Sequence, residues 1–367
     1  MKKVIVGISG GVDSAVSAYL LKKDGYDVEG LFMRNWDSSL NNDINGNPTL
    51  NGDICTQEKD YNDALAVCKK MGIKLHRIDF VKEYWDYVFK YFLDELENGR
   101  TPNPDIMCNK YIKFDMFKKE ADKLGADFIA TGHYAKVDNG NLLRGVDSNK
   151  DQTYFLSQVP RDKFSNVIFP IGDLEKTEVR KIAKEQDLIV ADKKDSTGIC
   201  FIGERNFKEF LTNYLPNKKG DVIDIDTNKK VGEHIGLMYY TIGQRRGLDI
   251  GGNDKRLYVV GKDLNKNILY VSLGDDTKYL LTDEALIESM NFISEKRPEK
   301  CTAKFRYRQE DVPVTIEYLN DEEIVVKYDN VKSVTPGQAC VLYLDEECIG
   351  GGIIKEVRKN GKKLWYL

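Results

Sequence analysis

A glycine-rich string near the start of the chain has the composition of a phosphate-binding loop. Residues 9–14 read Ser-Gly-Gly-Val-Asp-Ser and follow directly on a short apolar run that begins at residue 3. Two glycines between a strand and a helix allow a tight turn whose N–H groups face an anion at the helix N-terminus. Ser9 and Ser14 add hydroxyl donors, and Asp13 is a candidate carboxylate beside phosphate or magnesium. The spacing and lysine of a Walker A loop are missing, so we expect a different nucleotide loop.

Two of the seven cysteines lie in segments that favour chemistry over packing. Cys108 ends the proline-stiffened segment that begins at Thr101, and Cys200 lies in the Gly-containing segment 195–203. We expect Cys108 in a loop just ahead of a helix, whose N-terminus would stabilise its thiolate and make it nucleophilic. The odd number of cysteines and the lack of a C-x-x-C pair disfavour a disulfide scaffold, a zinc finger or another protein metal site. The cysteines expected to be small buried hydrophobic residues are Cys68, Cys301, Cys340 and Cys348.

Alternating strand and helix patterns surround the glycine string. Strands are predicted at residues 3–9, 28–33, 74–80 and 127–131, and helices at 15–21, 58–71, 83–96 and 111–124. This alternation favours an α/β fold with an open, Rossmann-like parallel sheet and helices on both faces. Two irregular segments interrupt it, at 98–109 and at 37–56, and we expect the second to be a mobile surface insertion.

The pattern changes after about residue 202, where short β-type runs with turn signals replace the helical period. From about residue 280 onward almost every segment is β-type. We expect an N-terminal catalytic domain at 1–204, a small mixed central domain at 205–278 and a C-terminal β-barrel at 279–367.

Composition is that of a soluble globular protein, with 41% hydrophobic and 31% charged residues. No signal-peptide pattern precedes the glycine string, and no apolar stretch is long enough to span a bilayer. We therefore expect a cytoplasmic protein with no membrane partner. The net charge of −4 gives no global attraction to nucleic acid, although local basic clusters such as Arg245-Arg246 remain available.

Longer strings resemble those of the bacterial tRNA-specific 2-thiouridylases, a family of the PP-loop ATP pyrophosphatase superfamily. The glycine string alone would fit any member of that superfamily, which splits ATP into AMP and pyrophosphate. The resemblance covers essentially the whole chain, and its departures, such as Ile8 and Thr153, are conservative. The strings that carry it are residues 7–14, 31–36, 103–109, 131–135, 150–156, 196–205, 240–248, 305–309 and 335–339.

The resemblance implies that sulfur replaces the C2 oxygen of the wobble uridine in tRNAs for lysine, glutamate and glutamine. ATP would adenylate that oxygen, with Mg2+ neutralising phosphate charge. The implied ATP-binding residues are Gly7, Ile8, Ser9, Gly10, Gly11, Val12, Asp13, Ser14, Met33 and Gly132.

The two cysteines take distinct roles by resemblance. Cys200 would carry sulfur as a persulfide received from a cysteine desulfurase or a sulfur relay protein. Cys108 would attack that persulfide to release sulfide, or close a Cys108–Cys200 disulfide after transfer. Asp105 would act as a base on Cys108 or on the target uridine.

The tRNA partner would be bound through its anticodon stem-loop, because a single-stranded base is extruded into a pocket more easily than a paired one. Arg306 and Tyr307 are expected on a strand, where alternating Arg and an aromatic residue favour RNA contact. The implied tRNA-binding residues are Asn103, Pro104, Asp105, His133, Lys150, Asp151, Gln152, Arg306, Tyr307 and Gln338.

Two other functions remain open from the sequence. A PP-loop synthetase or amidase acting on a small molecule would need an ammonia source, and it leaves the two cysteines and the barrel without roles. A non-catalytic tRNA-binding protein could use ATP as a structural ligand. Tests of tRNA-dependent pyrophosphate release and of a Cys200 variant separate the three.

Overall fold

The computed structural model describes residues 1–48, 56–195, 198–200, 202–203, 205–248, 250, 256–274 and 277–367. Part of the predicted insertion at 37–56 and four residues around Cys200 (Ser196, Thr197, Phe201 and Glu204) lie outside the described residues.

The N-terminal domain is built on a parallel sheet, as predicted; it has five strands in the order β3-β2-β1-β4-β7, of which β7 was not predicted. Strand β1 lies at its centre, and the chain connects outward from it in both directions, to β2 on one side and β4 on the other. Ligands of such sheets bind at the carboxyl ends of the strands where the order reverses. The glycine string follows β1 at that position. The strands are β1 (Lys3–Gly7), β2 (Asp27–Arg34), β3 (Leu75–Asp79), β4 (Phe128–Ala130) and β7 (Val167–Ile168).

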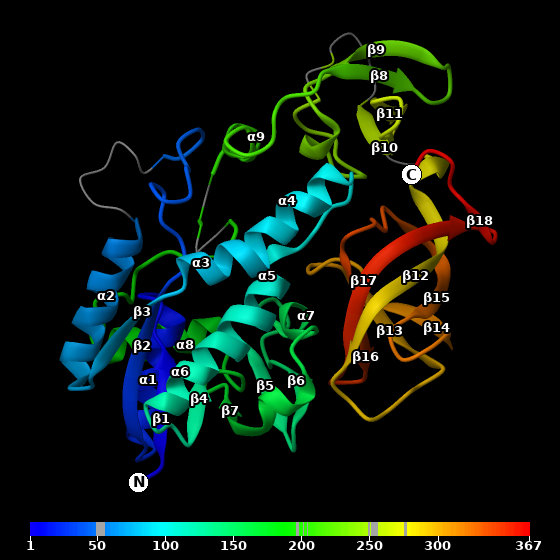
Figure 1. Ribbon diagram of the computed structural model, residues 1–367. Helices are drawn as coiled ribbons and strands as arrows, with labels where there is room; N and C mark the ends of the chain where they lie inside the picture. The colour runs from blue at the N-terminus through cyan, green and yellow to red at the C-terminus, as the bar shows by residue number, and fades with distance from the viewer. Residues whose placement is uncertain are drawn as a thin grey trace.

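Helices cover both faces of this sheet because alternate side chains of β1 are apolar on each face. Val4 and Val6 pack against the helices α1, α2 and α8, whereas Ile5 packs with the helices that follow β3. Figure 1 shows these two layers. The helices are α1 (Val12–Lys23), α2 (Thr56–Met71), α3 (Val81–Tyr84), η1 (Trp85–Phe89), α4 (Lys90–Glu97), α5 (Pro104–Met107), η2 (Cys108–Met116), α6 (Phe117–Lys123) and α8 (Lys176–Glu185).

The helix predicted from residue 111 begins earlier, at Pro104, so the expectation of an irregular segment up to residue 109 was wrong. Pro104 occupies the first helical turn, where its missing N–H costs nothing. The Asn103 side chain caps the helix by accepting a hydrogen bond from the Asp105 N–H at 3.2 Å. The proline that we expected to hold a loop extended instead starts a helix, and Cys108 lies inside it.

The central domain contains a four-stranded sheet in the order β10-β11-β8-β9, in which only β11 and β8 pair in parallel. It lies above the barrel in Figure 1, next to the C-terminal end of α4. Its elements are α9 (Phe207–Leu211), β8 (Gly220–Asp224), β9 (Lys229–His234), η4 (Leu237–Tyr239), β10 (Leu257–Asp263) and β11 (Ile268–Leu273).

The C-terminal domain is a closed antiparallel barrel of six strands, as predicted. The order β12-β15-β14-β13-β16-β17 closes through pairing of β12 with β17. The strands are β12 (Leu281–Phe292), β13 (Lys300–Lys304), β14 (Val312–Tyr318), β15 (Ile324–Lys332), β16 (Ala339–Leu344) and β17 (Glu347–Lys359). The remaining elements are β5 (Ala135–Asp138), β6 (Asn141–Arg144), α7 (Thr153–Leu156), η3 (Arg161–Asn166), η5 (Lys278–Leu280) and β18 (Lys362–Lys363).

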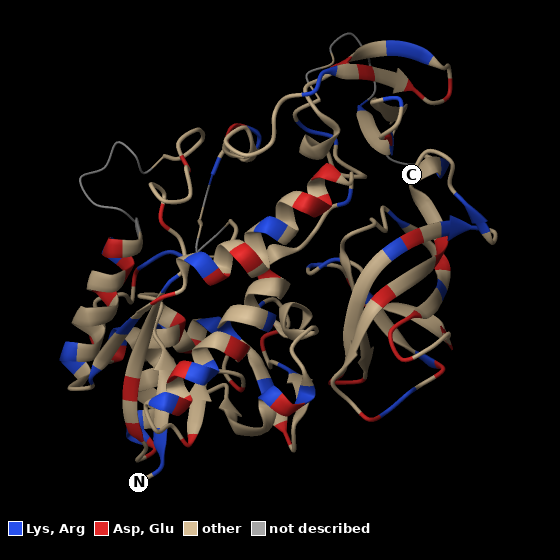
Figure 2. Ribbon diagram, in the orientation of Figure 1, with Lys and Arg blue, Asp and Glu red and all other residues tan. Residues whose placement is uncertain are grey.

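The three parts of the chain share a continuous interior. One buried apolar cluster contains Phe117 of α6, Val259 of β10 and Tyr343 of β16. The β5–β6 hairpin of the N-terminal domain also adds to the barrel sheet, where Leu142 pairs with Cys348. Lys and Arg are interspersed with Asp and Glu over the surface (Figure 2). Among the described helices, none has both the length and the apolar character needed to cross a bilayer.

Candidate active site

The glycine string forms a tight loop between β1 and α1. Gly10 has φ +74, and a Cβ there would lie 2.2 Å from the Asp60 carbonyl oxygen, so only glycine fits. The Ser14 hydroxyl accepts a hydrogen bond from the Ser9 N–H at 3.2 Å and donates one to the Gly11 carbonyl at 3.1 Å. The loop is therefore held in shape before any ligand binds.

Gly132, predicted from the sequence to bind ATP, lies against this loop. A Cβ at residue 132 would be 2.8 Å from the Ser14 nitrogen, so the end of β4 approaches the start of α1 closely. Met33, the other distant residue of that prediction, is buried near the carboxyl end of β2, beside β1. The predicted nucleotide residues thus gather at the carboxyl edge of the parallel sheet.

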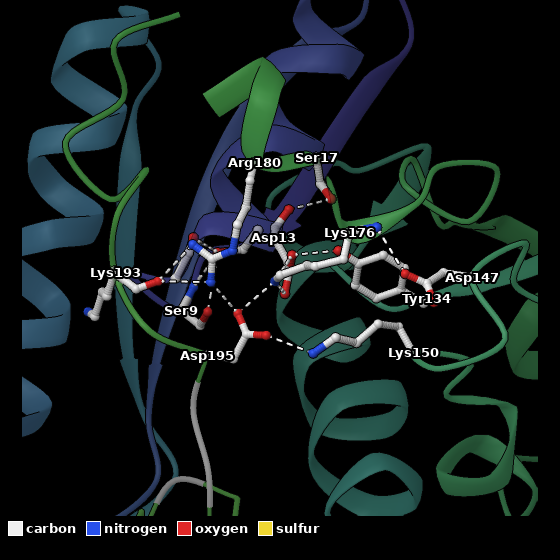
Figure 3. Close-up of polar contacts among 12 residues, drawn as sticks. Ser9, Asp13, Ser17, Tyr134, Asp147, Lys150, Lys176, Arg180, Lys193 and Asp195 are labelled. Atoms are coloured by element: carbon white, nitrogen blue, oxygen red, sulfur yellow. Dashed lines mark hydrogen bonds and ion pairs between the residues drawn. The ribbon is translucent and has the colours of Figure 1, made fainter. Parts of the chain in front are cut away.

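A buried lysine that sequence reasoning missed faces the loop (Figure 3). The Lys176 ammonium lies 2.7 and 2.8 Å from the two carboxylate oxygens of Asp13 and 2.8 Å from Asp195. The Tyr134 hydroxyl donates a hydrogen bond to Asp13 at 2.8 Å. Asp13 and Lys176 are 163 positions apart in the sequence and meet only in the folded structure, so no sequence motif predicts the pair.

Three further cations complete this polar group. Lys193 bonds to the Gly10 carbonyl at 2.8 Å, and Lys150 and Arg180 bond to Asp195 at 2.7 and 2.8 Å. Burial alone would raise the pKa of Asp195, but hydrogen bonds from Lys150 and Lys176 outweigh it and lower that pKa to about 2. The concentration of cations around a loop of backbone donors suits a polyanionic ligand such as a nucleotide.

The two predicted cysteines meet. The Sγ atoms of Cys108 and Cys200 are 3.7 Å apart, and both thiols are free. Asp105 accepts the Cys200 N–H at 2.9 Å, and the Tyr84 hydroxyl donates to the Cys200 carbonyl at 2.7 Å. Since a disulfide needs about 2.05 Å between its sulfurs, a small movement would join the pair.

The electrostatics of the pair differ from expectation. Burial raises the pKa of Cys108, whose side chain is fully buried, so the predicted stabilisation of its thiolate by a helix N-terminus was wrong. Cys108 lies past the first turn of the helix, beyond the N–H groups that would stabilise an anion. The hydrogen bond donated by Cys108, and then the charge of Lys113, lower the pKa of Cys200 despite burial. Of the two thiols, these contacts favour ionisation of Cys200 over that of Cys108.

Asp105 is held in a fixed place by its bond to Cys200. Burial raises its pKa, while the Cys200 N–H and Lys113 act in the opposite direction. The carboxylate positions the Cys200 backbone and already uses one oxygen to do so. Its expected role as a base stays a prediction.

Several residues predicted to contact tRNA form hydrogen bonds within the protein. His133 is buried, and its Nδ1 is bonded to the Thr131 hydroxyl at 2.7 Å. Burial and the charge of Lys113 lower the pKa of His133, so its ring is neutral. Asp151 accepts hydrogen bonds from the Gly145 N–H and the Thr153 hydroxyl, and the Gln152 amide accepts the Tyr134 N–H at 3.0 Å.

The barrel residues predicted to contact tRNA, Arg306, Tyr307 and Gln338, lie where the barrel meets the other domains. Arg306 and Tyr307 follow β13 in a turn, so the expectation that they lie on a strand was wrong. The Tyr307 ring packs against Phe155 with centroids 4.4 Å apart, and the Gln338 amide donates to the Thr101 carbonyl at 2.7 Å. Arg306 donates to backbone carbonyls, including that of Ile242 at 3.0 Å.

The described part of the predicted insertion, residues 37–48, is held in place rather than mobile. Asp43 forms a buried ion pair with Arg205 at 2.9 Å and accepts the Trp36 indole N–H at 3.0 Å. The Tyr214 hydroxyl donates to the Asn41 carbonyl at 2.9 Å. Because Arg205 closely follows Cys200 in the chain, this contact fixes one end of the cysteine segment.

Comparison with known proteins covers nearly the whole chain. Three family models match: a tRNA methyl transferase HUP domain at residues 2–204, a tRNA methyl transferase PRC-barrel domain at 208–273 and an aminomethyltransferase beta-barrel domain at 282–354.

Full-length relatives match closely. The chain is 58% identical to a protein from Mesoplasma florum, covering 96% of this chain and 98% of the relative. It is 56% identical to one from Mycoplasmopsis synoviae, with 100% and 99% covered, and 57% identical to one from Acholeplasma laidlawii, with 100% and 99% covered. All three relatives are named tRNA-specific 2-thiouridylase MnmA.

Replacing Gly10 with alanine should weaken ATP binding at least about tenfold, since positive φ costs a non-glycine residue about 1 to 3 kcal/mol and the new Cβ meets the Asp60 carbonyl. Calorimetric titration with ATP measures the effect. Gly25→Ala is the matched control, because its φ is also positive, at +84, with nothing within 4 Å of the new Cβ. Equal ATP affinity in both variants would contradict the loop assignment.

Replacing Asp43 with alanine should lower the free energy of unfolding by about 3 to 5 kcal/mol, because it removes the negative charge that the buried Arg205 faces. Urea-induced unfolding followed by tryptophan fluorescence measures the loss. Asp86→Asn, which breaks the exposed pair with Lys82, should leave stability nearly unchanged. A similar small effect for Asp43→Ala would show that the ion pair does not anchor this segment.

Proposed function

We propose that this chain, which belongs to the family of tRNA-specific 2-thiouridylases, replaces the C2 oxygen of the wobble uridine with sulfur at the Cys108–Cys200 pair. The observation that carries the proposal is the pair itself, two free thiols 3.7 Å apart, with the pKa of Cys200 lowered by the hydrogen bond from Cys108. Cys200 follows Asp195 of the phosphate-loop group by five residues, so one short segment joins both halves of the site. The substrates are tRNAs for lysine, glutamate and glutamine.

The first half-reaction activates the uridine. The C2 oxygen attacks the α-phosphorus of ATP, an O–P bond forms, the bond to the β-phosphate bridge breaks and pyrophosphate leaves. Residues 9–14 supply backbone and hydroxyl donors to the phosphates, and Lys176 and Lys193 balance their charge. The adenylated oxygen can then leave as AMP, which an unmodified carbonyl oxygen cannot do.

Magnesium suits this site. Mg2+ prefers one or two carboxylates together with substrate phosphates, and Asp13 and Asp195 both lie within 2.8 Å of the same Lys176 ammonium. These two carboxylates would hold the ion, which neutralises phosphate charge when bound.

The second half-reaction transfers sulfur. The outer sulfur of a Cys200 persulfide attacks C2 of the activated uridine, a C–S bond forms and AMP departs. Cys108 then attacks Cys200 Sγ, which forms the Cys108–Cys200 disulfide and releases the thiolated uridine. In the alternative order Cys108 attacks first, and the hydrosulfide that leaves attacks C2. Both routes end in a disulfide, which a cellular dithiol must reduce before the next turnover.

The partners follow from this chemistry. A cysteine desulfurase or a sulfur relay protein in the cytoplasm supplies the sulfur. The anticodon stem-loop of tRNA presents the uridine at the start of α5, where Asn103, Pro104 and Asp105 lie beside the thiol pair. The remaining predicted tRNA contacts require the internal bonds of His133 and Gln152 to exchange for bonds to RNA. The three domains that we propose end at residues 204, 278 and 367.

A small-molecule PP-loop synthetase is the second candidate, because the phosphate-loop group alone would serve it. Pyrophosphate release measured with and without total tRNA separates the two. Release that depends on a small acid and ignores tRNA would overturn the thiolation proposal.

Cys200→Ser and Cys108→Ser should each abolish 2-thiouridine formation while leaving tRNA affinity within about twofold, because neither thiol is needed to hold the RNA backbone. Mass spectrometry of the wobble nucleoside after reaction with ATP, tRNA and a sulfur source measures the product. Cys301→Ser is the matched control, since that thiol lies on β13 of the barrel. Thiolation by Cys200→Ser would show that the persulfide assignment is wrong.

Lys176→Met should slow tRNA-dependent pyrophosphate release about 100-fold or more, since it removes a cation from the developing phosphate charge. Lys181→Met is the control on the same helix, where Lys181 is exposed and pairs with Glu185. Thermal melts confirm that both variants fold. A rate for Lys176→Met within twofold of the unaltered protein would remove Lys176 from the mechanism.

A further inference from the structure

A cavity of about 170 Å³ lies at the junction of the three domains. One wall is the segment 98–100, which follows α4 and leads toward α5. The other walls come from the central domain and the barrel, and they include Ile242, Lys262, Leu264, Pro336 and Val357. Small ligands bind preferentially at domain interfaces, so the position of this cavity is one that a ligand commonly occupies.

A buried lysine of the central domain faces this cavity. Lys262 lies on β10, is only 8% exposed, and donates a hydrogen bond from its ammonium to the Gly99 carbonyl at 2.9 Å. Both residues line the cavity. An ammonium has three N–H donors, and among the described residues that of Lys262 forms no other hydrogen bond and no ion pair. Two of its donors are therefore available to a ligand.

The other charged groups that line the cavity are already paired. The ion pairs are Arg100 with Glu95 and Glu288 at 3.0 and 2.7 Å, Lys355 with Glu323 at 2.9 Å, and Lys363 with Glu356 at 2.9 Å. Burial lowers the pKa of Lys262 to about 7, as expected for an ammonium without a counterion. A buried charge is costly unless it is paired, so the cavity lacks one negative charge.

The remaining walls of the cavity are largely apolar, with the side chains of Ile242, Leu264, Val357 and Leu364 among them. An apolar cavity of about 150 Å³ in another protein holds a benzene molecule, so this cavity has room for a body of about that size. Inorganic phosphate suits it poorly, because phosphate has no apolar surface to bury and carries more charge than one ammonium neutralises. One unpaired ammonium and apolar walls together favour a singly charged anion with an apolar body.

We propose that this cavity is a binding site for a small monocarboxylate with an apolar body, about the size of benzoate, whose carboxylate accepts hydrogen bonds from the Lys262 ammonium. The bond from Lys262 to the Gly99 carbonyl persists, because the ligand uses the two other donors. The apolar body packs against Leu264 and Val357. This inference goes beyond the proposed function and uses none of the residues assigned to ATP, sulfur or tRNA.

The test is calorimetric titration of the full-length protein with benzoate, at a pH about one unit below the pKa of Lys262, where its ammonium is charged. We expect saturable binding with a dissociation constant in the millimolar range or tighter, as is typical of ligands of this size. Benzamide has nearly the same shape and no charge. It should bind at least about tenfold more weakly, because a hydrogen bond between two charged groups is lost.

Lys262→Met should weaken benzoate binding at least about tenfold, because methionine keeps an apolar stem but removes the charge. Lys363→Met is the matched control, since Lys363 lines the same cavity but is exposed and paired with Glu356. Its benzoate affinity should stay within about twofold of the unaltered protein, because an exposed ion pair contributes little. Thermal melts check folding, and Lys262→Gln replaces Lys262→Met should the latter fail to fold.

Equal benzoate affinity in the Lys262 variant and the unaltered protein overturns the inference, as does an equal loss in Lys363→Met. Benzamide binding as tight as that of benzoate also overturns it, and so does the absence of saturable benzoate binding. Inorganic phosphate is titrated in parallel, and tighter binding of phosphate than of benzoate would show that the class of ligand is wrong. These titrations involve neither ATP nor tRNA, so their failure leaves the thiolation proposal to its own tests.

Discussion

The active site depends on three contacts that hold Asp195, Cys200 and Arg205 against the N-terminal domain. Asp195 is held by the cations of the phosphate-loop group, Cys200 by the Asp105 carboxylate, and Arg205 by the buried Asp43. Each contact joins a charged or polar group to a different part of the domain. The phosphate-loop group and the thiol pair therefore lie at two points of one short segment, which the N-terminal domain holds at three described residues.

The sheet explains why the nucleotide end of that segment lies where it does. Parallel strands bring their carboxyl ends to one edge, and the reversal of order at β1 opens the crevice there. The barrel contacts the N-terminal domain through packing, such as Tyr307 on Phe155, and through backbone acceptors such as Thr101. These contacts give the predicted RNA residues a structural role in the absence of RNA, because buried polar groups must be paired.

Local patterns predicted much of this molecule. The glycine string, the parallel sheet and the barrel all follow from strong signals. No local pattern indicated whether Cys108 and Cys200 lie together without tRNA, and only the structure places their sulfurs 3.7 Å apart. The lysines could not be predicted, because Lys176 reaches Asp13 only through tertiary structure, across 163 positions. The start of α5 was predicted wrongly because proline is compatible both with an extended loop and with the first turn of a helix, where Pro104 lies. The π-helical segment Cys108–Met116 also has no sequence signature, so it was not predicted.

The need for order between the thiols is a chemical constraint on the pair. Two equivalent thiolates 3.7 Å apart would not distinguish donor from acceptor, and an early Cys108 thiolate would attack the persulfide before the uridine was activated. Sulfur would then be lost as sulfide, with a disulfide left behind. Adenylation must therefore precede the attack of Cys108, which places activation of the uridine ahead of disulfide closure in both routes.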